Sequence, residues 1–221
     1  GSTNGTQVNG RPVAGTIGLR DGDRVQIGEE LELRVSLQDA AEVEAARSRY
    51  ETAVRDHLTM VHNRGYFDDR LTEELAYAQR HGTRLSVLIL DLDHFKSIND
   101  DHGHQAGDNV LIRVANLAKS VLRTEDLIAR YGGEEFVILM PNTDLAGAVH
   151  LAEKVRMTVE STRLIIGDNM KPIDVTISLG VALFNGNRRE FFAEADKALY
   201  QAKDTGKNCV IIAGSDAVEA E

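Results

Sequence analysis

Two acidic segments of this sequence contain candidate catalytic or metal-binding residues. The first, residues 130–136, reads Arg-Tyr-Gly-Gly-Glu-Glu-Phe and stands between two apolar runs. A Gly-Gly pair supplies the positive φ angles of a tight hairpin and leaves a bare backbone against which a bulky ligand can lie. Glu134 and Glu135 are expected on opposite faces of the strand, so one acid can face a ligand while the other points away. The alternative is a solvated hairpin with surface acids.

The second segment is an apolar strand that runs directly into acids. Residues 85–90 are apolar apart from Ser86, and Asp91 and Asp93 follow. Continuous apolar strands are typical of the buried centre of a sheet. Asp91 and a hairpin glutamate on the neighbouring strand would form an oxygen-rich site suited to Mg²⁺, which keeps several waters and binds through one or two carboxylates plus substrate phosphates. The alternative is a pair of aspartates that only cap a helix.

The elements that must position these acids alternate in the α/β manner. Helices are expected where apolar residues recur at helical spacing, in 67–78, 108–121, 145–155 and 192–202. Strands are expected in the apolar runs 85–91, 136–140, 175–183 and 210–212. This order predicts a sheet with helices packed on it.

Five separated motifs in this order resemble the GGDEF family of diguanylate cyclases, in its GGEEF form. They lie at residues 56–64, 85–98, 99–108, 130–136 and 195–208. The resemblance spans roughly Asp56 to Ala213, with one departure, because the family usually has glycine where this chain has Met60. It implies an α/β (α+β) fold, namely the ferredoxin-like palm of nucleotidyl cyclases with a central antiparallel or mixed sheet flanked by helices.

The resemblance also implies the reaction, in which two GTP molecules condense into cyclic di-GMP and pyrophosphate is released. Asp91, the backbone carbonyl of Leu92 and Glu134 would hold Mg²⁺ or Mn²⁺, with two ions per active site when substrate is bound. Glu134, as proton acceptor, and Lys96 would be the catalytic residues. Because the product is a symmetric ring, two domains must face each other, and a homodimer is implied.

Substrate contacts follow from the resemblance as well, with backbone amides and lysines on the phosphates and polar side chains on the base. These residues are His94, Phe95, Lys96, Asn99, Asp108, Gly132, Gly133, Lys203 and Lys207. The family more often has arginine at position 207. Asn99 and Asp108 would bind the guanine edge, because an aspartate that accepts from the ring N–H and the amine rejects adenine, which lacks that donor pair.

Arg123 and Asp126 match the RxxD product-inhibition site of the same family in residue type and in distance from the glycines. Arg123 offers a planar fork of donors for phosphate or a guanine edge, and Asp126 offers an acceptor for guanine N–H groups. Cyclic di-GMP is therefore expected as an inhibitor as well as a product. The alternative is an ordinary exposed Arg-Asp pair near a helix C-terminus.

Residues 1–37 have a different sequence pattern from the rest of the chain. Turn residues separate short segments of alternating apolar and polar residues, which predict antiparallel strands. Residues 1–37 resemble the C-terminal part of a forkhead-associated (FHA) domain. In that family a phosphothreonine site includes the asparagine that matches Asn4, with Thr3 close by, so a complete FHA domain would bind a phosphothreonine peptide or its own phosphorylated N-terminus. Fewer than about 40 residues rarely hold a core alone, which favours a truncated domain.

A linker helix is expected at 38–60, where an apolar stripe of Val43, Tyr50, Val54, Leu58 and Val61 runs among charged residues. Its two interpretations are a parallel coiled-coil stalk that joins two catalytic domains and a helix packed on its own domain. The predicted organisation is thus a partial FHA segment at 1–37, this linker, a GGDEF domain at 61–213 and a tail at 214–221.

The composition limits the function classes. The 221 residues, 42% hydrophobic and 27% charged, indicate a globular protein, and a net charge of −10 argues against nucleic-acid binding. No run is long enough for a membrane span, and the single Cys209 favours a reducing cytoplasm, as expected for a bacterial signalling protein of this family. The competing functions are a GTP or cyclic di-GMP sensor and a mixed cyclic dinucleotide synthase. The acids at 91, 134 and 135 argue against the sensor, and Asp108 argues against the mixed synthase.

Overall fold

The computed structural model describes residues 5–28, 31–36, 39–166 and 171–214, and these divide into two compact units, Gly1–Glu51 and Thr52–Glu221. The first unit contains a four-stranded antiparallel sheet in the order β2-β1-β3-β4. The strands are β1 (Thr6–Val8), β2 (Arg11–Pro12), β3 (Arg24–Ile27) and β4 (Leu31–Arg34). The predicted antiparallel strands are confirmed. Thr3, Asn4 and Leu37 lie outside the described residues.

This sheet has very little core. Val8 is the one buried hydrophobic side chain among the described residues of the unit, and Leu31 and Leu33 remain about half exposed. A sheet of this size gains little from burial, because apolar area removed from water is the main favourable term in folding. Its stability within this chain therefore depends on few side chains.

The linker helix α1 spans Ala40–Val54 and ends earlier than predicted. Leu58 and Val61 are not on its stripe. The backbone N–H and the hydroxyl of Thr59 donate to the Asp56 carboxylate at 2.8 and 2.6 Å, which turns the chain out of the helix, and Val61 enters the core of the second unit. Met60 has a left-handed φ of 58° in this turn, which is the physical reason a glycine suits that position.

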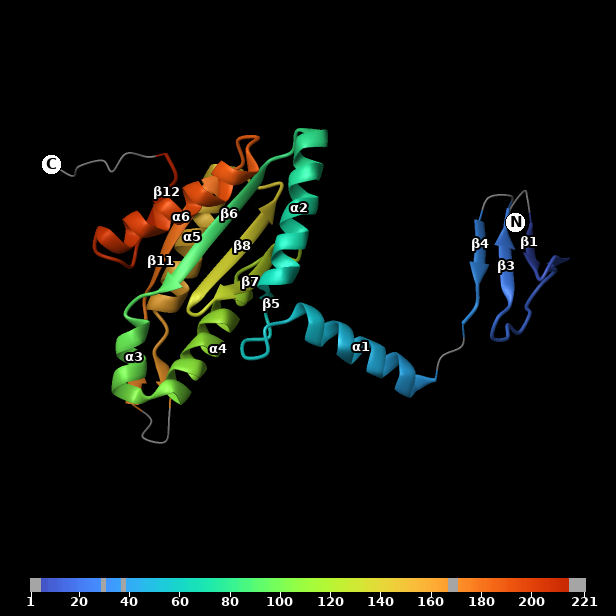
Figure 1. Ribbon diagram of the computed structural model, residues 1–221, viewed down its shortest axis with the longest axis horizontal. Helices are drawn as coiled ribbons and strands as arrows, with labels where there is room; N and C mark the ends of the chain where they lie inside the picture. Colours follow the sequence, from blue (N-terminus) through green and yellow to red (C-terminus); the bar gives the residue numbers. More distant parts are fainter. Residues whose placement is uncertain (1–4, 29–30, 37–38, 167–170, 215–221) are drawn as a thin grey trace. The chain divides into compact units, whose positions relative to one another are not determined.

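The second unit is built on a six-stranded mixed sheet in the order β12-β11-β6-β8-β7-β5 (Figure 1). The central strand β6 pairs antiparallel with both β11 and β8, whereas β12 and β5 add parallel edges. The strands are β5 (His62–Asn63), β6 (Leu85–Leu92), β7 (Leu127–Gly132), β8 (Glu135–Pro141), β11 (Ile177–Leu183) and β12 (Val210–Ile212). A separate hairpin joins β9 (Leu164–Ile166) and β10 (Lys171–Ile173).

Helices cover both faces of this sheet, so all eight residues of β6 are buried. Leu88, Leu90 and Leu92 pack into the core beneath α4 and α5, and Val87 and Ile89 pack into the core beneath α2 and α6. The helices are α2 (Arg64–His81), α3 (Phe95–His102), α4 (His104–Ser120), α5 (Leu145–Glu160) and α6 (Arg188–Asp204). The predicted mixed sheet flanked by helices is confirmed. No helix within the described residues is both long and apolar enough to cross a lipid bilayer.

Helix α6 lies directly against the backbone of β11 at Gly180. A Cβ atom at this position would lie 2.1 Å from the carbonyl oxygen of Ala195 and 2.4 Å from the backbone nitrogen of Leu199. Only glycine permits this approach. The close contact holds the C-terminal end of α6, which carries Lys203, against the sheet.

Candidate active site

The acidic hairpin has its two-residue turn at Gly133-Glu134, because Gly132 pairs with Glu135 across β7 and β8. This differs from the predicted Gly132-Gly133 turn, since only Gly133 has a positive φ, of 52°. Glu134 therefore lies in the turn, whereas Glu135 begins β8. A Cβ atom at Gly132 or Gly133 would meet nothing within 4 Å, so the backbone at the tip is open as expected.

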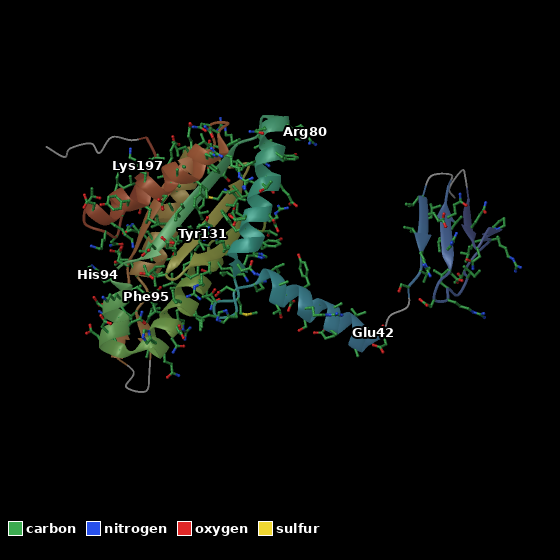
Figure 2. The ribbon with its side chains drawn as sticks, in the orientation of Figure 1. Glu42, Arg80, His94, Phe95, Tyr131 and Lys197 are labelled. Atoms are coloured by element: carbon green, nitrogen blue, oxygen red, sulfur yellow. The ribbon has the colours of Figure 1, made fainter. Side chains whose placement is uncertain are left out.

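A bulge at Tyr131 precedes the turn, because the pairing of β7 with β8 shifts by one residue between Arg130 and Gly132. The Tyr131 ring packs beside Phe67 of α2 and Phe192 of α6, at centroid distances of 5.9 and 5.0 Å. The Arg64 guanidinium lies 4.3 Å from the ring centroid. Figure 2 labels Tyr131 on the sheet. Since bulges redirect a strand, this anchored residue sets the direction in which the tip projects.

Asp91 is the buried acid of the site, with 6% of the residue exposed. It stands opposite Glu135 in the ladder, not opposite Glu134, and its carboxylate forms an ion pair with Lys203 of α6. Burial raises the pKa of Asp91 to about 6; Lys203 opposes this rise, and the charges of Glu134 and Glu135 add to it. The charges of two glutamates thus act on Asp91, and the Lys203 ammonium group lies beside its carboxylate.

This arrangement suits a cation that takes few protein ligands. Among the described residues no three His, Cys, Asp or Glu side chains are grouped closely enough to form a complete metal cage. Mg²⁺ binds through one or two carboxylates and completes its octahedron with water and phosphate oxygens. The buried Asp91 and the half-buried Glu134 therefore fit such an ion better than a Zn²⁺ or Ca²⁺ site.

The segment after β6 turns sharply into α3. His94 adopts a left-handed φ of 57°, and no side chain caps the first turn of the helix. Its leading N–H groups are therefore available to an anion, and the exposed Lys96 lies in the same turn. Figure 2 shows His94 and Phe95 together at this end of β6, and the buried Phe95 anchors the turn in the core.

Asn99 of α3 packs against the N-terminal part of α4, which carries Asp108. A Cβ atom at Gly107 would lie 2.0 Å from the Asn99 side-chain oxygen, so Asn99 packs on the backbone next to Asp108. Asp108 is exposed at the start of α4. The Asn99 amide thus packs against the residue that precedes Asp108 in the chain.

Two residues that hold the tip in place were not assigned a role from the sequence. Arg130 donates through Nε to the carbonyl oxygen of Gly133 at 2.9 Å and through a terminal nitrogen to Asp56 at 3.3 Å. Burial favours a higher pKa for Asp56, but hydrogen bonds from Thr59 and the charge of Arg130 bring it below its ordinary value. The turn at Gly133-Glu134 is thereby linked to the segment that follows α1.

The RxxD segment forms a compact turn at the start of β7. Asp126 accepts from the backbone N–H of Arg123 at 2.9 Å, and burial raises the pKa of Asp126 against the effect of Arg123. A cavity of about 200 Å³ adjoins it, lined also by His150 and Lys154 of α5. These two residues were not predicted; their i, i+4 spacing on α5 is the only sequence signal for them.

Comparison with known proteins agrees with this geometry. A family model described as diguanylate cyclase, GGDEF domain, matches residues 53–209, and an FHA domain model matches residues 1–28. The probable diguanylate cyclase DgcT of Escherichia coli K12 is 42% identical over 174 residues, covering 76% of this chain and 37% of DgcT. The response regulator PleD of Caulobacter vibrioides is 42% identical over 164 residues, covering 73% of this chain and 36% of PleD.

Solved structures give the same result. The coiled coil and GGDEF domain of DgcB from Caulobacter crescentus, in complex with c-di-GMP, matches with a TM-score of 0.73 at 35% identity, covering 78% of this chain and 94% of that one. The active GGEEF domain of a diguanylate cyclase from Vibrio cholerae matches with a TM-score of 0.64 at 32% identity, covering 70% of this chain and 98% of that one. This chain spans little more than a third of DgcT and PleD. Because the family model covers most of the second unit and these relatives agree with it, the chain belongs to the GGDEF-domain family of diguanylate cyclases.

Proposed function

We propose that this chain condenses two molecules of GTP into cyclic di-GMP and releases pyrophosphate. The observation that carries the proposal is the buried Asp91 at the end of β6, which forms an ion pair with Lys203. Glu134 and Glu135 are near enough for their charges to raise the pKa of Asp91. A buried acid among like charges is costly unless a cation offsets it. The complex of DgcB with c-di-GMP supports the same choice of nucleotide.

Asp91, the Leu92 carbonyl and Glu134 would hold Mg²⁺ or Mn²⁺, with two ions when substrate is bound. The ions would lower the cost of the 3′-alkoxide and offset phosphate charge. Glu134 accepts the proton of the 3′-hydroxyl, whose oxygen forms a bond to the α-phosphorus of the second GTP as the bond to the pyrophosphate oxygen breaks. Its place in an open turn gives its carboxylate access to that hydroxyl.

The remaining residues bind and orient the nucleotide. The uncapped N–H groups after His94, together with Lys96, Lys203 and Lys207, neutralise the terminal phosphates. Asn99 and Asp108 pair with the guanine edge, and Gly132 and Gly133 leave room for the ligand. Lys203 would exchange Asp91 for phosphate when the ions bind.

Turnover requires two copies of the domain, because each contributes one GTP to a symmetric product. Val43 and Tyr50 lie one heptad apart on α1 and are 50% and 60% exposed. We assign them to a parallel coiled-coil contact in a homodimer. A complete FHA domain would add phosphothreonine binding through Thr3 and Asn4, and this remains a prediction.

Feedback inhibition is the second part of the proposal. Cyclic di-GMP would bind Arg123 and Asp126, with His150 and Lys154 adding donors from α5. A cationic cavity next to a half-buried acid suits a ligand with both phosphates and guanine N–H groups.

The test of the main proposal is incubation with GTP and either Mg²⁺ or Mn²⁺, followed by chromatographic separation of the products. Cyclic di-GMP and pyrophosphate are expected. Nucleotide binding without product would instead identify a sensor, and mixed products formed in the presence of ATP would identify a mixed dinucleotide synthase.

A further inference from the structure

Asp93 is a buried acid that the proposed mechanism does not use. It is 3% exposed, and its carboxylate accepts three hydrogen bonds. The hydroxyls of Ser178 and Thr176 donate at 2.6 and 2.8 Å, and the backbone N–H of Asn208 donates at 3.0 Å. Because Asn208 follows α6 and the two hydroxyls lie at the start of β11, one carboxylate joins three segments at the end of the sheet.

The loop that Asp93 holds has an unusual backbone. Lys207 and Asn208 are consecutive non-glycine residues in the left-handed region, with φ of 66° and 48°. L-residues adopt this region rarely, asparagine more readily than lysine, and the conformation persists only where surrounding contacts enforce it. Lys207 in particular has no intrinsic preference for this conformation.

The enforcing contacts converge on Asn208. Its side-chain amide donates to Glu160 at 2.6 Å and accepts from Arg156 at 3.0 Å. The N–H of Lys207 donates to the carbonyl oxygen of Ala202 at 3.0 Å, at the end of α6. Asp93 supplies a side-chain contact from the end of β6, and the backbone N–H of Leu179 in β11 donates to the carbonyl oxygen of Cys209 at 3.0 Å. Asp93 is thus the side chain that ties Asn208 to the segment after β6.

This loop begins near the site acid. Asp91 and Asp93 are two residues apart on β6 and its extension, and they therefore point to the same face. Asp91 contacts Lys203 and Asp93 contacts Asn208, which places Lys207 between two tethered points of the chain. We propose that Asp93 is a positioning residue that holds the Lys207 ammonium next to the terminal phosphates of the bound nucleoside triphosphate. The inference rests on the proposed function.

A positioning role predicts an effect that depends on the phosphates of the ligand. The test measures the affinities of 3′-deoxy-GTP and 3′-deoxy-GMP by titration calorimetry, because neither ligand has the 3′-hydroxyl that condensation needs. Asp93→Asn should weaken 3′-deoxy-GTP binding by about tenfold, the scale of one charge-assisted hydrogen bond. Binding of 3′-deoxy-GMP should be unchanged.

Asp144→Asn is the matched control. Asp144 also accepts a backbone N–H, from Gly147 at 2.9 Å, but it lies beyond the opposite end of β8. The Asp144→Asn variant should bind 3′-deoxy-GTP and 3′-deoxy-GMP with the affinities of the wild type. Equal losses for both ligands in Asp93→Asn would overturn the inference, since they would indicate a general structural role.

A double-mutant cycle shows whether Asp93 acts through Lys207. Lys207→Gly removes the ammonium and relieves the left-handed strain, so adding Asp93→Asn to it should cause no further loss of 3′-deoxy-GTP affinity. Additive losses would overturn the inference. If Asp93→Asn does not fold, Asn208→Gly weakens the same loop without adding strain, and its loss should again be confined to 3′-deoxy-GTP.

The affinities of the wild type for the two ligands distinguish a failure of the proposed substrate from a failure of the role of Asp93. A wild type that binds 3′-deoxy-GTP no better than 3′-deoxy-GMP contradicts the proposed substrate. A clear preference that survives Asp93→Asn contradicts only the role of Asp93.

Discussion

Strand β7 has a charged turn at each end, and the two turns are held in opposite ways. The turn at its start is closed from within, because the Asp126 side chain accepts the backbone N–H of Arg123. The turn at its end is held by the Arg130 guanidinium, which donates to the carbonyl oxygen of Gly133 within the turn and to Asp56 outside it. The first turn is therefore a self-contained local structure. The second depends on a segment 74 residues away in the chain.

This difference fits the roles proposed for the two turns, which are ligand binding at Arg123 and catalysis at Glu134. A self-closed turn leaves the Arg123 guanidinium exposed without further support, which suits ligand capture. The turn at the tip leaves the Glu134 side chain without a hydrogen bond or ion pair among the described residues, and its backbone is positioned through Arg130. We infer that changes in the segment after α1 reach Glu134 through Asp56 and Arg130, whereas the Arg123 turn is insulated from them.

The largest expected effect concerns Glu134 itself. Glu134→Gln removes the proposed proton acceptor at the tip while preserving the shape of the side chain, and general base catalysis contributes roughly a hundredfold to ten-thousandfold. We expect product formation to fall by at least this factor, measured by chromatography, with an unchanged thermal unfolding curve. A well-folded variant with substantial activity would contradict the role of Glu134 and remove the contrast between the two turns.

The next effect concerns the pH dependence of stability near the tip. The folded pKa of Asp91, raised by burial to about 6, lies above its ordinary value, so the folded state holds a proton that the unfolded state releases. Stability of the metal-free protein should therefore fall as pH rises from about 4 to about 6, by at most about 3 kcal/mol. Denaturant unfolding at each pH measures this.

Asp91→Asn should remove most of that pH dependence, because an amide does not titrate. Asp126→Asn is the comparison at the other turn, where burial also raises the pKa of the carboxyl. An Asp91→Asn variant whose stability changes with pH as that of the wild type does would show that Asp91 is not the group with the raised pKa.

The external support of the tip predicts a smaller effect. Arg130→Gln loses the charge-assisted bonds to Gly133 and Asp56, so kcat should fall by about tenfold while the affinity for 3′-deoxy-GTP stays within about twofold. Arg84→Gln is the control. Arg84 forms an exposed ion pair with Asp144, with 2.6 Å between the charged atoms, and this pair lies away from the tip. A loss of nucleotide affinity as large as the loss of kcat would contradict a role confined to the turn.

The smallest effect concerns the turn at the start of β7. Arg123→Ala removes the guanidinium but not the Asp126 side chain, so added cyclic di-GMP should reduce the rate several-fold less than in the wild type. The ratio of rates with and without added product measures this, together with calorimetry of cyclic di-GMP on nucleotide-free protein. Equal product affinity in wild type and Arg123→Ala would exclude this turn as the inhibitory site.

The sequence alone determined the elements and the chemistry that each could carry. The apolar run before Asp91 predicted a central strand, the glycines before Glu134 predicted a hairpin tip, and the order of the elements predicted a sheet with helices packed on it. These features depend on residue type and local periodicity, which are readable over a few residues. The palm was implied by the resemblance of the motifs to the family.

Contacts between residues far apart in the chain could not be predicted from the sequence and are set by the fold. The fold placed Asp91 opposite Glu135, ended α1 at Val54 where Asp56 turns the chain, and brought His150 and Lys154 to the cavity beside Arg123. Asp93 gains its bond to Asn208 from 115 positions away. Such contacts are set by strand register and by helix packing, as at Gly180, where a one-residue slip would turn every side chain to the other face of the sheet.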